Sequence, residues 1–217
     1  MGDATLYTVL PTHTAEVGIT LAQVGIMLGV NRAIRLLSNP AAGIAYDRIQ
    51  RRWIFVPALF LGAISTAIYG LAGNFWLLLF GRLLWGISWS GIWVGGTTMI
   101  LDVATDQNRG KWSGLYQIWF FTGTAIGALS GGVMTDVLGY YGTMWVCSAV
   151  TAIGAVFALL FLPETRPELS PDTRYKHNRQ KPVTELPPAE SSDHHKVRIT
   201  QIWSSQNKQR FAFVVWL

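Results

Sequence analysis

Half of the 217 residues are hydrophobic and only 13% are charged, whereas charged residues make up about 25% of a typical soluble domain. This composition excludes an ordinary soluble globular protein and favours a membrane-embedded helical bundle. The 10 Trp and 22 Gly residues fit such a bundle, because Trp gathers at membrane interfaces and small residues let helices approach closely. The net charge of +5 is confined to short polar stretches, which indicates cytoplasmic loops and argues against nucleic acid as a partner.

The two ends of the chain read like parts of helices. The N-terminus lacks the basic, apolar and small-residue regions of a signal peptide. Residues 6–11 resemble the end of a helix that has already begun, and residues 211–217 resemble the start of another. We therefore expect a fragment of a longer protein.

Apolar stretches long enough to cross a membrane follow one another along the chain. A hydrocarbon core of about 30 Å takes about 20 helical residues, and the stretches that meet this length are residues 17–46, 53–72, 75–101, 112–137 and 140–162. The first is longer than one crossing. Its second half holds Arg32 and Arg35, which would snorkel, pair with a helix outside the chain, or line the inner mouth of a pathway.

The basic residues alternate along the connections between these stretches. They occur in residues 47–52 and 102–111 and in the segment from residue 163 onward, and they are absent from residues 73–74 and from the connection around residues 136–139. By the positive-inside rule, loops 47–52, 102–111 and 163–209 are predicted to face the cytoplasm.

The segment 163–209 is rich in polar residues and is predicted to be largely disordered. Within it, residues 197–203 would form either a short helix on the membrane surface or a lead-in to the next helix. The pair His194 and His195 reads as part of a solvated loop rather than as a metal site, and we expect neither a metal nor a cofactor.

No enzymatic motif stands out, so the polar residues inside the apolar stretches carry the functional prediction. Arg82 lies roughly 10 Å below the outer surface at about 1.5 Å per residue, and a buried Arg usually faces a partner or a solute pathway. Trp85, Trp89 and Trp93 follow on the same helical face. This pattern predicts a substrate site for anionic or aromatic solutes, and the alternative is plain packing against lipid or neighbouring helices.

Other residues in these stretches allow two interpretations. Gln117, with Ser113 and Thr124, would line a water-filled pathway or make ordinary interhelical hydrogen bonds. Glycines at four-residue spacing, at 123, 127 and 131, would serve packing or let helices pivot. Because no Asp, Glu or His lies well inside the five stretches, we expect any proton carrier to lie in a helix outside the chain.

Several motifs together resemble the major facilitator superfamily. Its loop signature, Gly-x-x-x-Asp-Arg/Lys-x-Gly-Arg-Arg/Lys, is matched by Gly43, Asp47, Arg48, Arg51 and Arg52, with Gln50 in place of the usual Gly. Arg82 resembles the fourth-helix Arg of the family, and Arg109 and the segment 163–165 are also similar to its patterns. The fifth-helix antiporter spacing is matched, with Ala128 where Pro is usual, by Gly114, Gly123, Gly127, Gly131 and Gly132.

The resemblance implies an all-α integral membrane fold, the six-helix N-terminal bundle of a twelve-helix transporter, truncated within helix one and at the start of helix seven. Residues 1–162 would form the bundle, 163–209 the cytoplasmic central loop, and 210–217 the start of helix seven. Asp47, Arg48 and Arg51 would form a conformational latch with Asp102.

The function that the resemblance implies is secondary active transport of a small solute by alternating access in the inner or plasma membrane, most simply as an exporter or antiporter. An importer or facilitator of the same fold, or a non-transporting scaffold or sensor, are the alternatives. The expected partners are the solute, the lipid bilayer, the second half of the transporter and a coupling proton.

Overall fold

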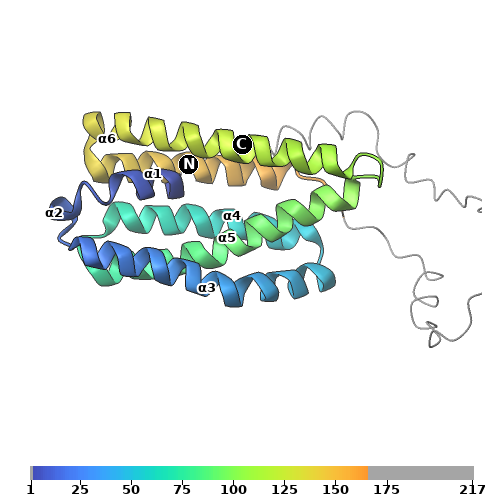
Figure 1. The fold of residues 1–217 in the computed structure, drawn as a ribbon, viewed down its shortest axis with the longest axis horizontal. Coiled ribbons are helices and arrows are strands. Elements are labelled where there is room, and N and C mark those ends of the chain that lie inside the picture. The colour runs from blue at the N-terminus through green and yellow to red at the C-terminus, as the bar shows by residue number, and fades with distance from the viewer. Residues whose placement is uncertain (1, 166–217) are drawn as a thin grey trace, which may run out of the picture.

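The computed structural model describes residues 2–165, and its regular elements within that range are all α-helices. Four long helices run along the long axis of the molecule, and the short α1 lies beside α6 (Figure 1). In chain order the elements are α1 (Gly2–Val9), α2 (Thr14–Val17), α3 (Leu21–Arg48), α4 (Arg51–Leu71), α5 (Phe75–Val103) and α6 (Arg109–Phe161). The predictions for residues 166–217, including the remainder of the central loop, the surface helix, the His pair and the start of helix seven, lie outside the described residues.

α6 consists of two rods that fold back on each other at Gly139. This residue has φ 71° and ψ 175°, a left-handed conformation that glycine adopts without the steric penalty of a Cβ atom. The fourth and fifth predicted stretches are therefore separate rods joined by a very tight reversal. Figure 1 shows the two rods side by side, with the reversal at the end of the bundle that also holds α2.

Three helices, α4, α5 and α6, are long and apolar enough to cross a membrane. Because α6 has 53 residues and reverses at Gly139, its length suffices for two crossings. α3 has 28 residues, or about 42 Å at 1.5 Å per residue, but it is more polar than the other three. The predicted crossing by its stretch stays a prediction.

The helix boundaries follow local capping chemistry. Thr20 and Gln23 form a capping box, so α3 begins at Leu21 and not at the predicted residue 17. The side chain of Asn74 accepts a hydrogen bond of 2.9 Å from the backbone N–H of Leu77 at the start of α5.

The connection predicted at residues 47–52 is shorter than expected. α3 continues through Asp47 and Arg48, and only Ile49 and Gln50 separate it from α4. A cation in the last turn of a helix, here Arg48, is favoured by the helix dipole. The charges of this segment therefore belong to two helix ends rather than to a loop.

Small polar side chains bind neighbouring helices together by donating to backbone carbonyls across the interface. This pattern is expected where helices pack closely in an apolar medium. The bonds are Ser65 to Gly81 (2.7 Å), Ser88 to Ala58 (2.7 Å), Ser148 to Ala63 (2.9 Å), Tyr46 to Gly91 (2.8 Å) and Thr5 to Gly127 (2.8 Å). They join α4 to α5, α4 to α6, α3 to α5 and α1 to α6.

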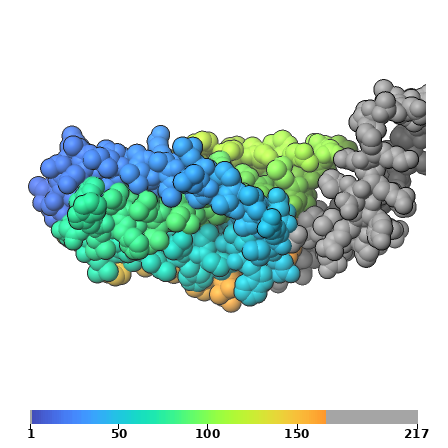
Figure 2. Space-filling model, turned by 90° about the horizontal axis from the view of Figure 1, so that it is seen from below, coloured from blue at the N-terminus to red at the C-terminus, as the bar shows by residue number. Residues whose placement is uncertain are grey.

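The buried apolar side chains gather at the two ends of the bundle. One cluster lies near the reversal of α6 and includes Leu6, Met27 and Tyr140, and the other lies near the end of α5 and includes Val56 and Met99. Many large apolar side chains remain exposed on the outer faces, for example Leu36 at 76% and Leu129 at 75%. A surface of this kind suits contact with lipid or a further helical bundle. Figure 2 shows the same elongated body from below, with α3 along it in blue.

Candidate functional site

An ion pair buried within the bundle joins α1 to α5. Nη1 of Arg82 lies 2.6 Å from Oδ1 of Asp3, and the Arg82 side chain is 0% exposed. The guanidinium carbon also lies 4.9 Å from the ring centre of Tyr7 and 5.4 Å from that of Tyr69. Because a lone buried charge is very unfavourable, the carboxylate and the two rings are what make this position of Arg82 tenable.

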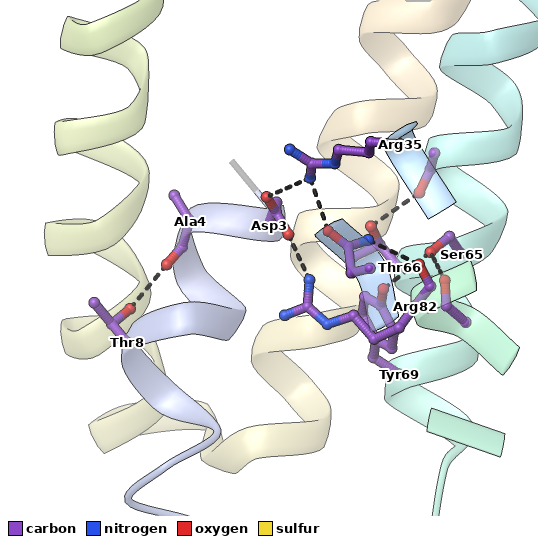
Figure 3. A network of polar contacts seen from close by, with 11 residues as sticks. Asp3, Ala4, Thr8, Arg35, Ser65, Thr66, Tyr69 and Arg82 are labelled. Carbon is purple, nitrogen blue, oxygen red and sulfur yellow. Dashed lines mark hydrogen bonds and ion pairs between the residues drawn. The ribbon is translucent and has the colours of Figure 1, made fainter. Parts of the chain in front are cut away.

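Asp3 also faces a second cation. Nη2 of Arg35, on α3, lies 3.8 Å from Oδ2 of Asp3, so the carboxylate stands between two guanidinium groups (Figure 3). The distance to Arg35 is too long for a hydrogen bond, whereas the contact with Arg82 is a short, charge-assisted one. Asp3 therefore has one tight partner and one loose partner.

Asn31 ties the two cations into one network. Its side-chain N–H donates to the backbone carbonyl of Arg82 at 2.8 Å, and its Oδ1 accepts from Nη2 of Arg35 at 2.9 Å. Ser65 donates a hydrogen bond of 2.7 Å to the backbone carbonyl of Gly81, the residue that precedes Arg82. Figure 3 shows this network across α1, α3, α4 and α5.

The network holds more donors than acceptors. Nε of Arg35, Nε and Nη2 of Arg82 and Nε1 of Trp85 are buried, and none has a hydrogen-bond partner among the described residues. All of these atoms carry N–H groups that donate and cannot accept. Around Asp3 two cations thus face one anion and the unpaired donors outnumber the acceptors, and Oδ1 of Asn39, one turn from Arg35 on α3, is a buried acceptor that also has no partner among the described residues.

Trp89 and Trp93 of α5 form an aromatic wall with Phe120 of α6. Trp89 and Trp93 stack with ring centres 5.9 Å apart at 15°, and Phe120 lies 5.5 Å from Trp89 and 5.2 Å from Trp93. Tyr116 extends the wall at 6.0 Å from Trp93. Trp89 and Trp93 of the predicted aromatic stripe therefore belong to one continuous surface that spans two helices. Gln117, which lies between Tyr116 and Phe120 in the sequence, is half-buried.

The cation beside this wall differs from the predicted one. Arg35 lies over Trp89, with 4.9 Å from its guanidinium carbon to the ring centre, whereas Arg82 faces the tyrosines. The prediction that Arg82 and the Trp stripe form one cation–aromatic surface is wrong in this respect. Long side chains on one helical face can point in different directions. The tight pairing with Asp3 directs the Arg82 side chain away from the aromatic wall.

Sequence reasoning also missed the carboxylate. The expectation that no acidic residue serves the interior was drawn from the five apolar stretches, and Asp3 lies upstream of all of them, in α1. The available signal was the spacing Asp3 to Tyr7, which places a carboxylate and an aromatic ring one helical turn apart on one face.

A second polar cluster lies at the opposite end of the bundle from the reversal at Gly139. Nε of Arg51 donates to Oδ2 of Asp102 at 3.0 Å, and both side chains are largely buried. This pair joins α4 to α5, and the predicted latch that also includes Asp47 and Arg48 stays a prediction. Asp47 and Arg48 lie exposed in the last turn of α3 at the same end, and Arg109 pairs at 3.4 Å with the exposed Asp106.

Glu164 completes this second cluster. Its two carboxylate oxygens accept hydrogen bonds from the backbone N–H groups of Arg51 at 3.0 Å and of Arg52 at 3.2 Å. A carboxylate at a helix N-terminus is favoured by the helix dipole and satisfies donors that the helix leaves unpaired. Arg52 in turn donates through Nη2 to the carbonyl of Leu159. The chain segment after α6 is thereby bound to the start of α4.

The antiporter-like glycines divide into two groups. Gly127 and Gly131 are buried where α1 crosses α6, and a Cβ atom at Gly131 would overlap Thr5. Gly114, Gly123 and Gly132 have open space where a Cβ atom would stand, as does Gly43 in the loop signature. Close packing thus accounts for two of the five positions.

Comparisons with known proteins agree with this architecture. The sequence profile of the Major Facilitator Superfamily matches residues 1–217. "Multidrug resistance protein 1" of Bacillus subtilis is 29% identical over 77% of this chain and 43% of its own length. "Quinolone resistance protein NorA" of Staphylococcus aureus is 24% identical over 63% of this chain and 35% of its own length.

A relative named for a different role is the "Probable 4-methylmuconolactone transporter" of Cupriavidus pinatubonensis, which is 32% identical over 54% of this chain and 27% of its own length. The chain thus spans less than half the length of the curated relatives that it matches. All-helical architecture, apolar helices of spanning length and a profile match along the whole chain lead to one conclusion: the chain belongs to the Major Facilitator Superfamily of membrane transporters.

Proposed function

We propose that this chain forms the N-terminal bundle of a secondary active transporter, which moves a small solute by alternating access between two six-helix halves. The observation that carries the proposal is the Asp3–Arg82 ion pair, with Arg35 at its edge. Ionisable groups inside a membrane bundle are costly and mark solute or proton pathways. Family membership points to transport rather than catalysis.

Asp3 is the proposed proton carrier, in place of the carrier expected in a helix outside the chain. Its side chain is 18% exposed, so a proton can reach it, and its charge is shared by the two cations Arg82 and Arg35. Protonation of Asp3 would leave the buried Arg82 without its ionic partner, so we expect it to accompany a change of conformation in which the loose contact of 3.8 Å with Arg35 is released first. A change of protonation is thereby converted into a change at the surface beside Trp89.

The second cluster is the proposed conformational latch. Arg51, Asp102 and Glu164 connect α4, α5 and the chain after α6 at one end of the bundle. We place this end, with loops 47–52 and 102–111, on the cytoplasmic side of the inner or plasma membrane because it carries the basic residues. Here the latch would hold the bundle against the second half until the transporter reorients.

The multidrug and quinolone resistance for which two relatives are named supports export as the direction. A specific observation favours proton-coupled import as a second candidate. Two guanidinium groups and one carboxylate form the centre, so protonation of Asp3 adds net positive charge and strengthens the attraction for an anionic solute. Ligands that strengthen each other's binding travel together, which is symport.

The test is flux through proteoliposomes that contain the protein as its gene encodes it. An imposed pH gradient should drive movement of ethidium or 2-naphthoate, and Asp3→Asn should abolish that driven flux while leaving solute counterflow. Glu16→Gln, at an exposed carboxylate of α2, is the matched control and should retain the driven flux. Gradient-driven flux in Asp3→Asn equal to that of the unsubstituted protein would exclude Asp3 as the carrier, and absence of any flux would support the scaffold alternative.

A further inference from the structure

The surface beside Asp3 carries features that identify the class of solute. Arg35 of α3 lies over Trp89 of α5, which stacks on Trp93 and meets Phe120 of α6. Three helices thus contribute to one patch made of a cation and flat rings, which we call the Arg35–Trp89 face. We propose that this face binds the transported solute and that the solute is a flat aromatic carboxylate. The inference rests on the proposed transport function.

The members of the face are accessible in the way that a binding surface requires. The Arg35 side chain is 21% exposed, and Trp89, Trp93 and Phe120 are half-buried. Arg82, in contrast, is 0% exposed. Arg35 is therefore the cation that meets the solute, while Arg82 holds Asp3 in place.

The Arg35–Trp89 face contains an unpaired hydrogen-bond donor, which a solute could satisfy with an acceptor. Nε of Arg35 is a buried donor without a partner among residues 2–165. Nη2 of Arg35 is already shared between Asn31 and, loosely, Asp3. A carboxylate fits the guanidinium fork with two parallel hydrogen bonds and supplies the missing acceptor.

The charge balance selects an anion over a cation. Among the described residues, Asp3 is the only carboxylate that pairs with Arg35 or Arg82. A cationic solute at the face would lie beside the guanidinium of Arg35, whose counter-ion Asp3 is already paired tightly with Arg82, and an anion would compensate this excess charge. The stacked rings of Trp89 and Trp93 favour a flat aromatic body, because offset stacking adds to the burial of apolar area.

The experiment measures equilibrium binding of radiolabelled 2-naphthoate to the protein, as its gene encodes it, in lipid nanodiscs. Three analogues compete for the face and vary one property each. They are 2-naphthamide, which lacks the charge, cyclohexanecarboxylate, which lacks the aromatic ring, and 2-naphthylmethylammonium, which reverses the charge. 2-Naphthoate should bind about 10-fold more tightly than the amide, and more tightly still than the ammonium ion.

Variants then locate the binding. Arg35→Gln should weaken 2-naphthoate binding about 10-fold or more and leave 2-naphthamide binding nearly unchanged. Trp89→Leu should weaken both about 5-fold. Arg32→Gln, at an exposed cation of the same helix, and Trp76→Leu, at a Trp that is 74% exposed on α5, are the matched controls and should bind as the unsubstituted protein does.

Three results would overturn the inference: tighter binding of the ammonium ion than of 2-naphthoate, equal loss in Arg35→Gln and Arg32→Gln, or no binding of 2-naphthoate. The ligand series on the unsubstituted protein decides the question even where a variant fails to fold. Gradient-driven ethidium flux in proteoliposomes separates the two proposals. Ethidium flux that requires Asp3, without 2-naphthoate binding, would support the transport proposal and exclude the anion site. Binding of 2-naphthoate without any flux would support the anion site and exclude the transport proposal.

Discussion

Arg82 is the residue whose environment constrains the bundle most. Its side chain is fully buried and its only ionic partner among the described residues is Asp3. In a buried pair, the desolvation of both charges offsets much of their attraction, so the pair adds little net stability. Removing one partner is different, because it leaves an uncompensated charge in an apolar interior.

This asymmetry makes a stability prediction. Asp3→Leu should destabilise the protein by about 3–5 kcal/mol, whereas the double variant Asp3→Leu with Arg82→Met should recover most of that loss. Thermal unfolding in detergent, followed by circular dichroism, provides the measurement. If the double variant were less stable than Asp3→Leu, the penalty would not come from an unpaired Arg82. Such a result would point instead to lost packing against Tyr7 and Tyr69.

At the scale of elements, α1 is held to α6 by close packing on glycine. Thr5 donates to the carbonyl of Gly127, and its side chain occupies the space that a Cβ atom at Gly131 would need. Thr5 is β-branched and stiff at χ1, so it has little freedom to move aside. This contact positions α1, and with it Asp3, against Arg82.

The neighbouring glycine offers a direct comparison. Gly131→Ala should destabilise the bundle by about 1–3 kcal/mol through overpacking against Thr5. Gly132→Ala meets open space and should be neutral or stabilise the helix by up to about 1 kcal/mol, since Ala has the higher helix propensity. Thermal unfolding of both variants in the same detergent tests this, and Thr5→Ala should relieve the defect of Gly131→Ala. Equal effects at the two positions would contradict the packing assigned to α1 and α6.

At the scale of the whole molecule, two polar clusters occupy different regions of one bundle. The Asp3 network joins α1, α3 and α5, and the latch joins α4 and α5 to the chain after α6. α5 belongs to both clusters, so a displacement of α5 would move residues of the proposed solute face and of the proposed latch. In the proposed alternating-access cycle, this shared helix would connect the proposed solute face with the proposed latch.

The latch proposal predicts a shift in conformational equilibrium. Asp102→Asn removes the ionic partner of the largely buried Arg51 and should favour the state in which this end is open, by about 1–3 kcal/mol. A cysteine at Ile49, in a Cys147→Ser background, should then be alkylated about 5-fold faster or more. Asp106→Asn, at a side chain that is 90% exposed, is the control and should leave the alkylation rate unchanged. Unchanged alkylation in Asp102→Asn as well would show that the pair is no latch.

The sequence by itself determined the features that depend on local chemistry. Apolar length and charge placement identified the helical membrane bundle, and the loop signature identified the family, because these signals lie within short stretches. The contact of Arg51 with Asp102, 51 residues away, was implied only by the family resemblance. The sequence could not determine how short the connection between α3 and α4 is. There Glu164, 113 residues from Arg51, accepts hydrogen bonds from the backbone at the N-terminus of α4.

Only the tertiary structure decided which charges meet. Asp3 and Arg82 are 79 residues apart, and helical periodicity tells which side chains share a face without telling which helix lies opposite. The packing of α1 against α6 through Thr5 and glycine brings Asp3 to Arg82. That pairing turns Arg82 away from the aromatic wall and leaves Arg35 beside Trp89.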